Sequence, residues 1–96
     1  MTRTIRINAD YLSETTIAKY INPVISGEGT IELPPVVLIP GIISYFSQDN
    51  SVMLKITEEL KMEKLKKQKK HLPEDLISLL AFAILQGFSY IEITLK

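Results

Sequence analysis

The sequence predicts a mixed α/β (α+β) fold in a single two-layer domain, with about four strands in a mixed sheet and three or four helices packed on it. Three observations lead to this prediction. Short segments near both ends and in the middle alternate apolar and polar residues, which is the pattern of half-buried strands. Longer segments between them have helical spacing and helix-capping residues. A chain of 96 residues is long enough for one hydrophobic core but not for two, so residues 1–96 are assigned to one domain.

The first quarter of the chain predicts a strand followed by a helix. Residues 4–8 alternate between isoleucine and polar side chains, as a strand with one buried face does. Ser13 is placed to cap a helix over residues 14–21, where apolar residues recur at helical spacing. The pair Asn22-Pro23 is expected to end this helix, because a residue that precedes proline disfavours the helical conformation.

The middle of the chain is dominated by glycine, proline and branched apolar residues. Turn residues precede a predicted strand over residues 30–33, and the apolar run 36–39 suits a buried extended segment. Pro40 suits the first turn of a helix, so the apolar residues of segment 42–46 predict a short amphipathic helix. The sequence leaves open whether residues 34–50 are mostly strand or mostly helix.

The second half predicts a strand, two helices and a final strand. Apolar residues alternate over residues 52–57, which favours a strand. Residues 58–70 begin with acids, end with lysines and contain strong helix formers, so a mostly solvated helix is expected. Pro73 opens and Gly87 closes a last, largely apolar helix. Residues 89–95 alternate again and predict the fourth strand.

The composition indicates a cytoplasmic protein. The chain has no cysteine, which excludes a disulfide framework and a thiolate metal site, and small secreted proteins normally need such staples. The first seven residues alternate in polarity where a signal peptide has a continuous apolar stretch, so no export signal is expected. The most apolar segment, residues 76–85, is about half as long as the roughly 20 residues that cross a bilayer. No membrane span is therefore expected.

No residue pattern predicts catalysis, a metal site or a bound cofactor. The single histidine, His71, has Glu74 nearby in sequence but lies in a cationic connector, which lacks the dry surroundings of a catalytic acid or base. The serines form no nucleophile elbow, and the glycines form no phosphate loop. Two acidic pairs, Glu58-Glu59 and Glu74-Asp75, open predicted helices, where the helix dipole accounts for them. We therefore predict a non-enzymatic protein; a small enzyme whose site forms between subunits is a third alternative.

The strongest local signal is the lysine-rich segment, defined here as residues 61–70. It contains six lysines and one glutamate, a formal charge of +5 in a chain whose net charge is zero. Such a segment attracts acidic protein surfaces, membrane surfaces and nucleic-acid phosphates. It lacks the arginine and aromatic residues that read or stack on bases, and it also suits a solvated helix end. The residues predicted to contact a partner or nucleic acid are Lys61, Lys64, Lys66, Lys67, Lys69 and Lys70.

The apolar character of the last predicted helix is the second signal. More of its circumference is apolar than one sheet face covers, so either another helix of the same chain or a subunit interface must cover the rest. The chain is 46% hydrophobic and its mean hydropathy is +0.15, which is high for so small a protein. The predicted assembly interface comprises Leu76, Leu79, Leu80, Phe82, Tyr45 and Phe46.

These observations predict a small binding or regulatory module, such as an inhibitor, adaptor or accessory subunit. It is expected to self-associate as a homo-oligomer and to bind another macromolecule. The expected partner is a protein with an acidic surface. The alternative is a nucleic-acid-binding accessory protein that uses the lysine-rich segment. The sequence names neither the partner nor the number of subunits.

Overall fold

The computed structural model describes residues 3–25, 36–39, 41–47 and 50–95, with only the backbone for residues 36–38. Within these residues, five strands form one mixed sheet in the order β1-β5-β4-β3-β2. The first and last strands of the chain pair in parallel, and every other pair of neighbours is antiparallel. The strands are β1 (Thr4–Asn8), β2 (Val36–Ile39), β3 (Ile42–Ser47), β4 (Ser51–Ile56) and β5 (Tyr90–Thr94).

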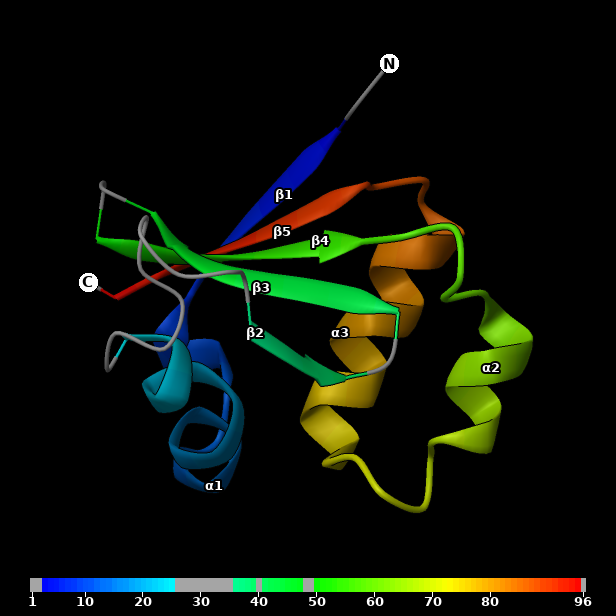
Figure 1. Ribbon diagram of the computed structural model, residues 1–96, viewed down its shortest axis with the longest axis horizontal. Coiled ribbons are helices and arrows are strands. Elements are labelled where there is room, and N and C mark those ends of the chain that lie inside the picture. The colour runs from blue at the N-terminus through cyan, green and yellow to red at the C-terminus, as the bar shows by residue number, and fades with distance from the viewer. Residues whose placement is uncertain (1–2, 26–35, 40, 48–49, 96) are drawn as a thin grey trace.

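The helices lie on one side of this sheet (Figure 1). Two of them, α1 (Glu14–Thr16) and α3 (Glu74–Leu85), lie beneath the strands, and α2 (Met62–Lys67) stands beside α3. A 3-10 turn, η1 (Ala9–Tyr11), links β1 to α1, which continues as the π-helical stretch η2 (Ile17–Ile21). The predicted two-layer α/β class is thus confirmed, with α1, α2 and α3 as its helices. No helix of the described residues is long and apolar enough to cross a membrane.

The sheet buries only the face that points toward the helices. In β5, Ile91 and Ile93 are fully buried, while the alternating residues Tyr90, Glu92 and Thr94 are partly exposed. The same alternation runs through β1 and β3, because successive side chains of a strand point to opposite faces. Isoleucine and leucine from strands and helices fill one core cluster, whose largest fully buried members include Ile21, Ile42, Leu54, Leu65, Leu76, Leu80, Ile91 and Ile93. Among the described residues, no helix lies on the opposite face of the sheet, which is called the uncovered face below.

The first predicted helix is confirmed at its start but runs further than expected. Ser13 is the N-cap residue, and its hydroxyl accepts a hydrogen bond from the backbone N–H of Thr16. Helical geometry then continues past Asn22 and through Pro23 to residue 25. Proline has no N–H to donate, and burial of Ile21 and Val24 offsets that missing bond. The predicted strand over residues 30–33 lies outside the described residues.

The helix predicted over residues 42–46 is wrong, because this segment forms β3. Apolar residues at positions 42, 43, 45 and 46 fit a helical period and also a strand with apolar side chains on both faces. Hydrogen-bonded pairing with neighbouring strands decides between helix and strand for this segment. Ile42 lies opposite Ile39 on β2 and Ile56 on β4, so β3 has a hydrogen-bonded neighbour on each side. The segment 36–39, which suited an extended conformation in a region left open between strand and helix, forms the strand β2.

The predicted helix over residues 58–70 is shorter than expected at both ends. Residues 58 and 59 form a turn, in which the N–H of Leu60 donates to the carbonyl of Thr57. This turn brings Leu60 into the core, where it is 3% exposed. After α2, the N–H groups of His71 and Leu72 donate to the carbonyl of Gln68, so the chain turns there toward α3. Only Met62–Lys67 is helical.

The turn between β2 and β3 depends on Gly41. Its φ of +86° lies in the left-handed region, and a Cβ at this position would lie 2.7 Å from the Cβ of Leu60. Its carbonyl accepts hydrogen bonds from both the N–H and the hydroxyl of Thr57, the latter at 2.8 Å. Gly41 thus allows the strand β3 and the turn that follows β4 to approach each other closely.

Replacing Gly41 by alanine should destabilise the protein more than replacing Gly87, which also has a positive φ. A Cβ at Gly87 would meet only Arg3 Nη1 at 3.9 Å, an ordinary contact. Gly87→Ala should therefore cost about 1 kcal/mol from backbone strain alone, whereas Gly41→Ala should cost about 2–5 kcal/mol because the collision with Leu60 is added. Urea unfolding at neutral pH measures both. Equal losses would show that the close approach to Leu60 is unimportant.

Candidate partner-binding surface

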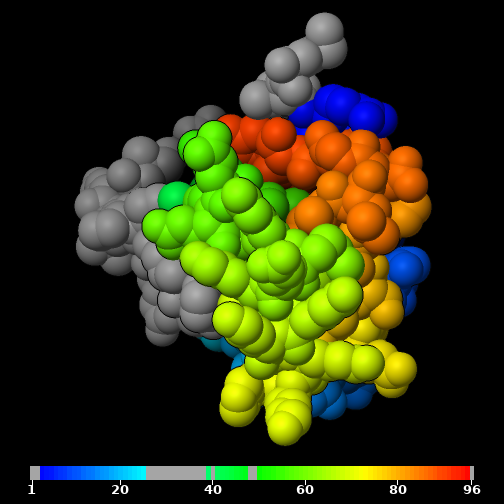
Figure 2. Space-filling view, turned by 90° about the vertical axis from the view of Figure 1, so that its right-hand side faces the viewer, coloured from blue at the N-terminus to red at the C-terminus, as the bar shows by residue number. Residues whose placement is uncertain are grey.

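The lysine-rich segment forms an exposed, positively charged surface on α2 and the turn that follows. All six of its lysines are exposed. In Figure 2 the side chains of this part of the chain spread outward across the face that α2 presents. Leu65 and the partly buried Met62 hold α2 against the rest of the protein, and Leu65 is 1% exposed. The structure therefore places all six predicted contact residues on one continuous stretch of surface.

These lysines have no carboxylate partner within the described part of the chain. The one ion pair found there joins Arg6 Nε and Glu92 Oε1 at 3.2 Å, on the uncovered face of the sheet. Lys64, Lys66 and Lys67 lie in the last turn of α2, where the helix dipole favours positive charge. Lys61 is at the opposite end, as the N-cap residue without a side-chain cap, where the dipole disfavours positive charge. Helix stabilisation thus accounts for only part of the charge.

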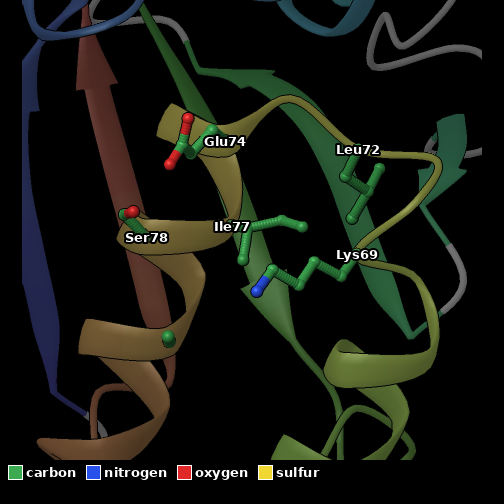
Figure 3. A pocket seen from close by; sticks show the side chains of 6 residues that line it. Lys69, Leu72, Glu74, Ile77 and Ser78 are labelled. Carbon is green, nitrogen blue, oxygen red and sulfur yellow. The ribbon is translucent and has the colours of Figure 1, made fainter.

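A groove adjoins the lysine-rich segment, between the outer side of α3 and the turn that follows α2 (Figure 3). Its volume is about 440 Å³. Its apolar lining comes from Leu72 on the turn and from Ile77 and Ala81, which are one helical turn apart on α3. The polar residues that complete the lining are Lys69, Glu74 and Ser78. The sequence alone does not predict this groove, because its walls come from segments that meet only in the folded chain.

Three of the predicted assembly residues lie in the core of the chain itself. Leu76, Leu79 and Leu80 are 0–3% exposed, so they form no surface. Their burial corrects the prediction that these three residues belong to an assembly interface. Other elements of the same chain cover these three residues, whereas Phe82 and Leu85 of the same helix stay exposed. Phe46 is partly buried and packs against the core.

Phe82 and Tyr45 remain at the surface, in two separate places. Phe82 is 48% exposed and stacks on Phe88, with 6.3 Å between the ring centroids. Arg3 lies 4.6 Å from the centre of the Phe88 ring and donates a hydrogen bond of 2.8 Å to the carbonyl of Gln86, at the end of α3. Phe82 is therefore part of a contact that joins the end of α3 to the start of β1.

Tyr45 lies on the uncovered face of the sheet. The strand register places it in a row with Met53, Glu92 and Arg6, one residue from each of β3, β4, β5 and β1. Partial burial raises the pKa of the Tyr45 phenol, and the charge of a nearby Tyr90 phenolate raises it further. A neighbouring row holds Ile43, Lys55, Tyr90 and Thr4. Ile43, Tyr45 and Met53 thus form an apolar cluster on β3 and β4, and the charged residues Lys55 and Glu92 lie directly beside it.

The remaining polar residues of the sequence analysis lie apart from one another in the part of the chain that the structure describes. His71 is exposed in the turn after α2. Glu58 and Glu59 line a second hollow of about 580 Å³ at the end of β4, together with Lys55, Ser89 and Tyr90. Among the described residues, no three histidine, aspartate or glutamate side chains cluster closely enough to hold a metal ion.

Asp75 fixes the start of α3, and with it one wall of the groove. Its carboxylate accepts hydrogen bonds from the N–H of Ser13 at 2.8 Å, from the hydroxyl of Thr16 at 2.7 Å and from the N–H of Leu76 at 2.9 Å. Partial burial by itself would raise the pKa of Asp75, but these hydrogen bonds outweigh it and lower the pKa. The same carboxylate therefore joins α1 to α3 in its charged form.

Comparisons with protein families, with curated proteins and with solved structures find no match for this chain. Only the geometry and charge of the described residues therefore indicate a function.

Replacing Asp75 by asparagine should destabilise the protein by about 1–3 kcal/mol at neutral pH, because a neutral amide turns one N–H donor toward groups that also donate. The folded-state pKa of Asp75 is lowered, so its contribution is complete above the unfolded value of about 3.9 and is lost as the pH falls through the folded value. The variant should therefore lose less stability than the wild type on acidification. Unfolding curves from neutral to acid pH test this.

Glu74→Gln is the matched control for this experiment, since it removes an exposed carboxylate at the adjacent position. It should leave the stability and its acid dependence close to those of the wild type. An Asp75→Asn variant with unchanged stability at neutral pH would contradict the proposed role of the carboxylate.

Proposed function

We propose that the protein is a non-enzymatic binding module that engages an acidic surface of another protein through its lysine-rich segment. The supporting observation is that six exposed lysines gather on α2 and the following turn, while no described carboxylate pairs with any of them. A chain with zero net charge has enough carboxylates to neutralise this segment. None of the described carboxylates forms an ion pair with its lysines. Such concentrated charge speeds encounter with an acidic partner.

A protein partner is favoured over nucleic acid by what surrounds the lysines. The segment has no aromatic residue on which bases could stack and no arginine to read them. The groove beside it is lined by leucine, isoleucine and alanine, which suit apolar side chains of a protein. In keeping with the absence of cysteine, we place this function in the cytoplasm.

The double variant Lys66→Gln/Lys67→Gln should weaken binding to a labelled, glutamate-rich peptide by about three- to tenfold at low salt, since each exposed charge contact contributes modestly. The charge-matched control is Lys19→Gln/Lys55→Gln, which removes two exposed lysines from α1–η2 and from the uncovered sheet face. The control should bind like the wild type. Fluorescence anisotropy at low and high salt measures both affinities.

Two outcomes would count against an acidic protein partner. Equal weakening by the two double variants would mean that overall charge matters and the lysine-rich segment does not. Tighter binding of a short single-stranded or duplex DNA than of the peptide, with the same dependence on Lys66 and Lys67, would favour the nucleic-acid alternative.

Self-association through the uncovered face of the sheet is the second part of the proposal. An apolar cluster on β3 and β4, formed by Ile43, Tyr45 and Met53, is partly exposed, and no helix of the described residues lies above it. Arg6 and Glu92 lie side by side on β1 and β5, so two copies stacked face to face could exchange these charges. Four strands about 4.8 Å apart and about 17 Å long span roughly 300 Å² of sheet, which is small for an interface. The dimer should therefore dissociate on dilution.

Light scattering over a range of concentrations tests this proposal. The wild-type mass should rise from 10.9 kDa toward twice that value, while Tyr45→Glu should stay at the mass of one chain, because the variant places a carboxylate in the apolar cluster that the second copy covers. Tyr11→Glu is the control, since Tyr11 is 61% exposed and lies outside this face. A wild-type mass that never exceeds one chain, or an equal effect of both variants, would refute dimerisation by this face.

A further inference from the structure

The groove between α3 and the turn after α2 combines an apolar floor with a positively charged rim. Figure 3 shows the Lys69 side chain extending from the turn toward Ile77, with Leu72 on the same side. Leu72 and Ala81 pack against the core, but Ile77 is not among the residues that do so. Ile77 is a partly exposed isoleucine whose free surface lines the groove. An apolar surface in this position lacks a partner within the described chain.

We propose that this groove receives an apolar side chain from an acidic, amphipathic segment of the partner protein, whose carboxylates lie over the lysine-rich segment. This inference rests on the proposed function and adds to it the site and the chemical class of the ligand. The volume of about 440 Å³ is within the range of pockets that hold small ligands, so one large apolar side chain fits.

Charge complementarity identifies the occupant. A segment that places an apolar side chain between Ile77 and Leu72 passes Lys69 when it extends toward the lysine-rich segment, whose formal charge is +5. Basic or neutral apolar segments gain nothing from that surface, whereas each carboxylate of an acidic segment finds an unpaired ammonium group. A nucleic acid would satisfy the lysines but would leave the apolar floor uncovered.

Glu74 gives the bound segment a direction. In Figure 3 it lies on the α3 side of the groove, together with Ser78, while Lys69 lies on the side of the turn. A carboxylate over Glu74 would be repelled, so the acidic residues of the segment should lie toward Lys69. Uncharged or hydroxyl-bearing residues should lie toward Glu74 and Ser78. The groove therefore distinguishes the two orientations of an acidic segment.

The test compares two labelled, glutamate-rich peptides of equal charge, one with a central leucine and one with alanine at that position. Wild-type protein should bind the leucine peptide about tenfold more tightly, because the groove buries part of the larger side chain. Ile77→Ala should reduce this preference to near one. Leu85→Ala is the control: it removes a similar side chain, 70% exposed, from the same helix but outside the groove. It should retain the preference.

Ala81→Arg provides a second, independent variant. It adds a positive charge while narrowing the groove, so binding of the alanine peptide should be unchanged or tighter and binding of the leucine peptide should be weaker. A purely electrostatic surface would instead bind both peptides more tightly. Circular dichroism and urea unfolding confirm that each variant is folded, since Ile77 and Ala81 are only partly buried.

The outcomes separate this inference from the proposed function. If both peptides bind equally and Lys66→Gln/Lys67→Gln weakens both, the lysine-rich segment binds acids and the groove inference is overturned. If the preference for leucine persists in Ile77→Ala and Ala81→Arg, the leucine binds elsewhere and the inference is also overturned. If neither peptide binds, the proposed function fails and this inference fails with it.

Discussion

The structure depends on the insertion of the last strand between the first strand and β4. Ile91 and Ile93 of β5 are fully buried, and their register sets Ile5 and Ile7 of β1 beside them on the helical face. Without β5, β1 would have no neighbour and the sheet would end at β4. Because β5 is antiparallel to β4, a short hairpin could join these two strands. The chain instead forms α2 and α3 between them. The groove lies where these two segments meet, so it is a consequence of this topology.

The elements that the sequence predicted well are those whose pattern fits only one structure. Strict alternation over residues 4–8 and 90–94 fits a half-buried strand, and Pro73 with Gly87 marks both ends of α3. Residues 42–46 fit two periods, and only pairing with β2 and β4 makes them a strand. Likewise, the start of α2 depends on Leu60 meeting Gly41, which lies far away in sequence. Sequence patterns record local preferences, whereas these outcomes depend on long-range contacts.

The candidate site shows the same division. Exposure of the lysines could be predicted, because six ammonium groups on one short segment cannot be buried without partners. The buried state of Leu76, Leu79 and Leu80 could not, since it depends on how widely the sheet and the N-terminal helical region cover α3. The position of Asp75 at the start of a predicted helix suggested only an interaction with the helix dipole. In the structure its carboxylate also accepts hydrogen bonds from Ser13 and Thr16, which belong to the start of α1. The groove itself needs both α3 and the turn after α2.

Charge and shape make different contributions to recognition by this surface. At physiological ionic strength, salt screens exposed charges beyond about 8 Å, so the lysines attract an acidic partner only once it is near. Exposed ammonium groups also discriminate poorly among acidic partners, because each contact is weak and tolerant of geometry. An apolar groove beside the lysines adds this discrimination. It binds most tightly a partner whose apolar side chain lies at the right distance from its carboxylates. Lys69 takes part in both, as it belongs to the lysine-rich segment and lines the groove. The proximity of these two features, more than the charge alone, is what would make this small protein selective.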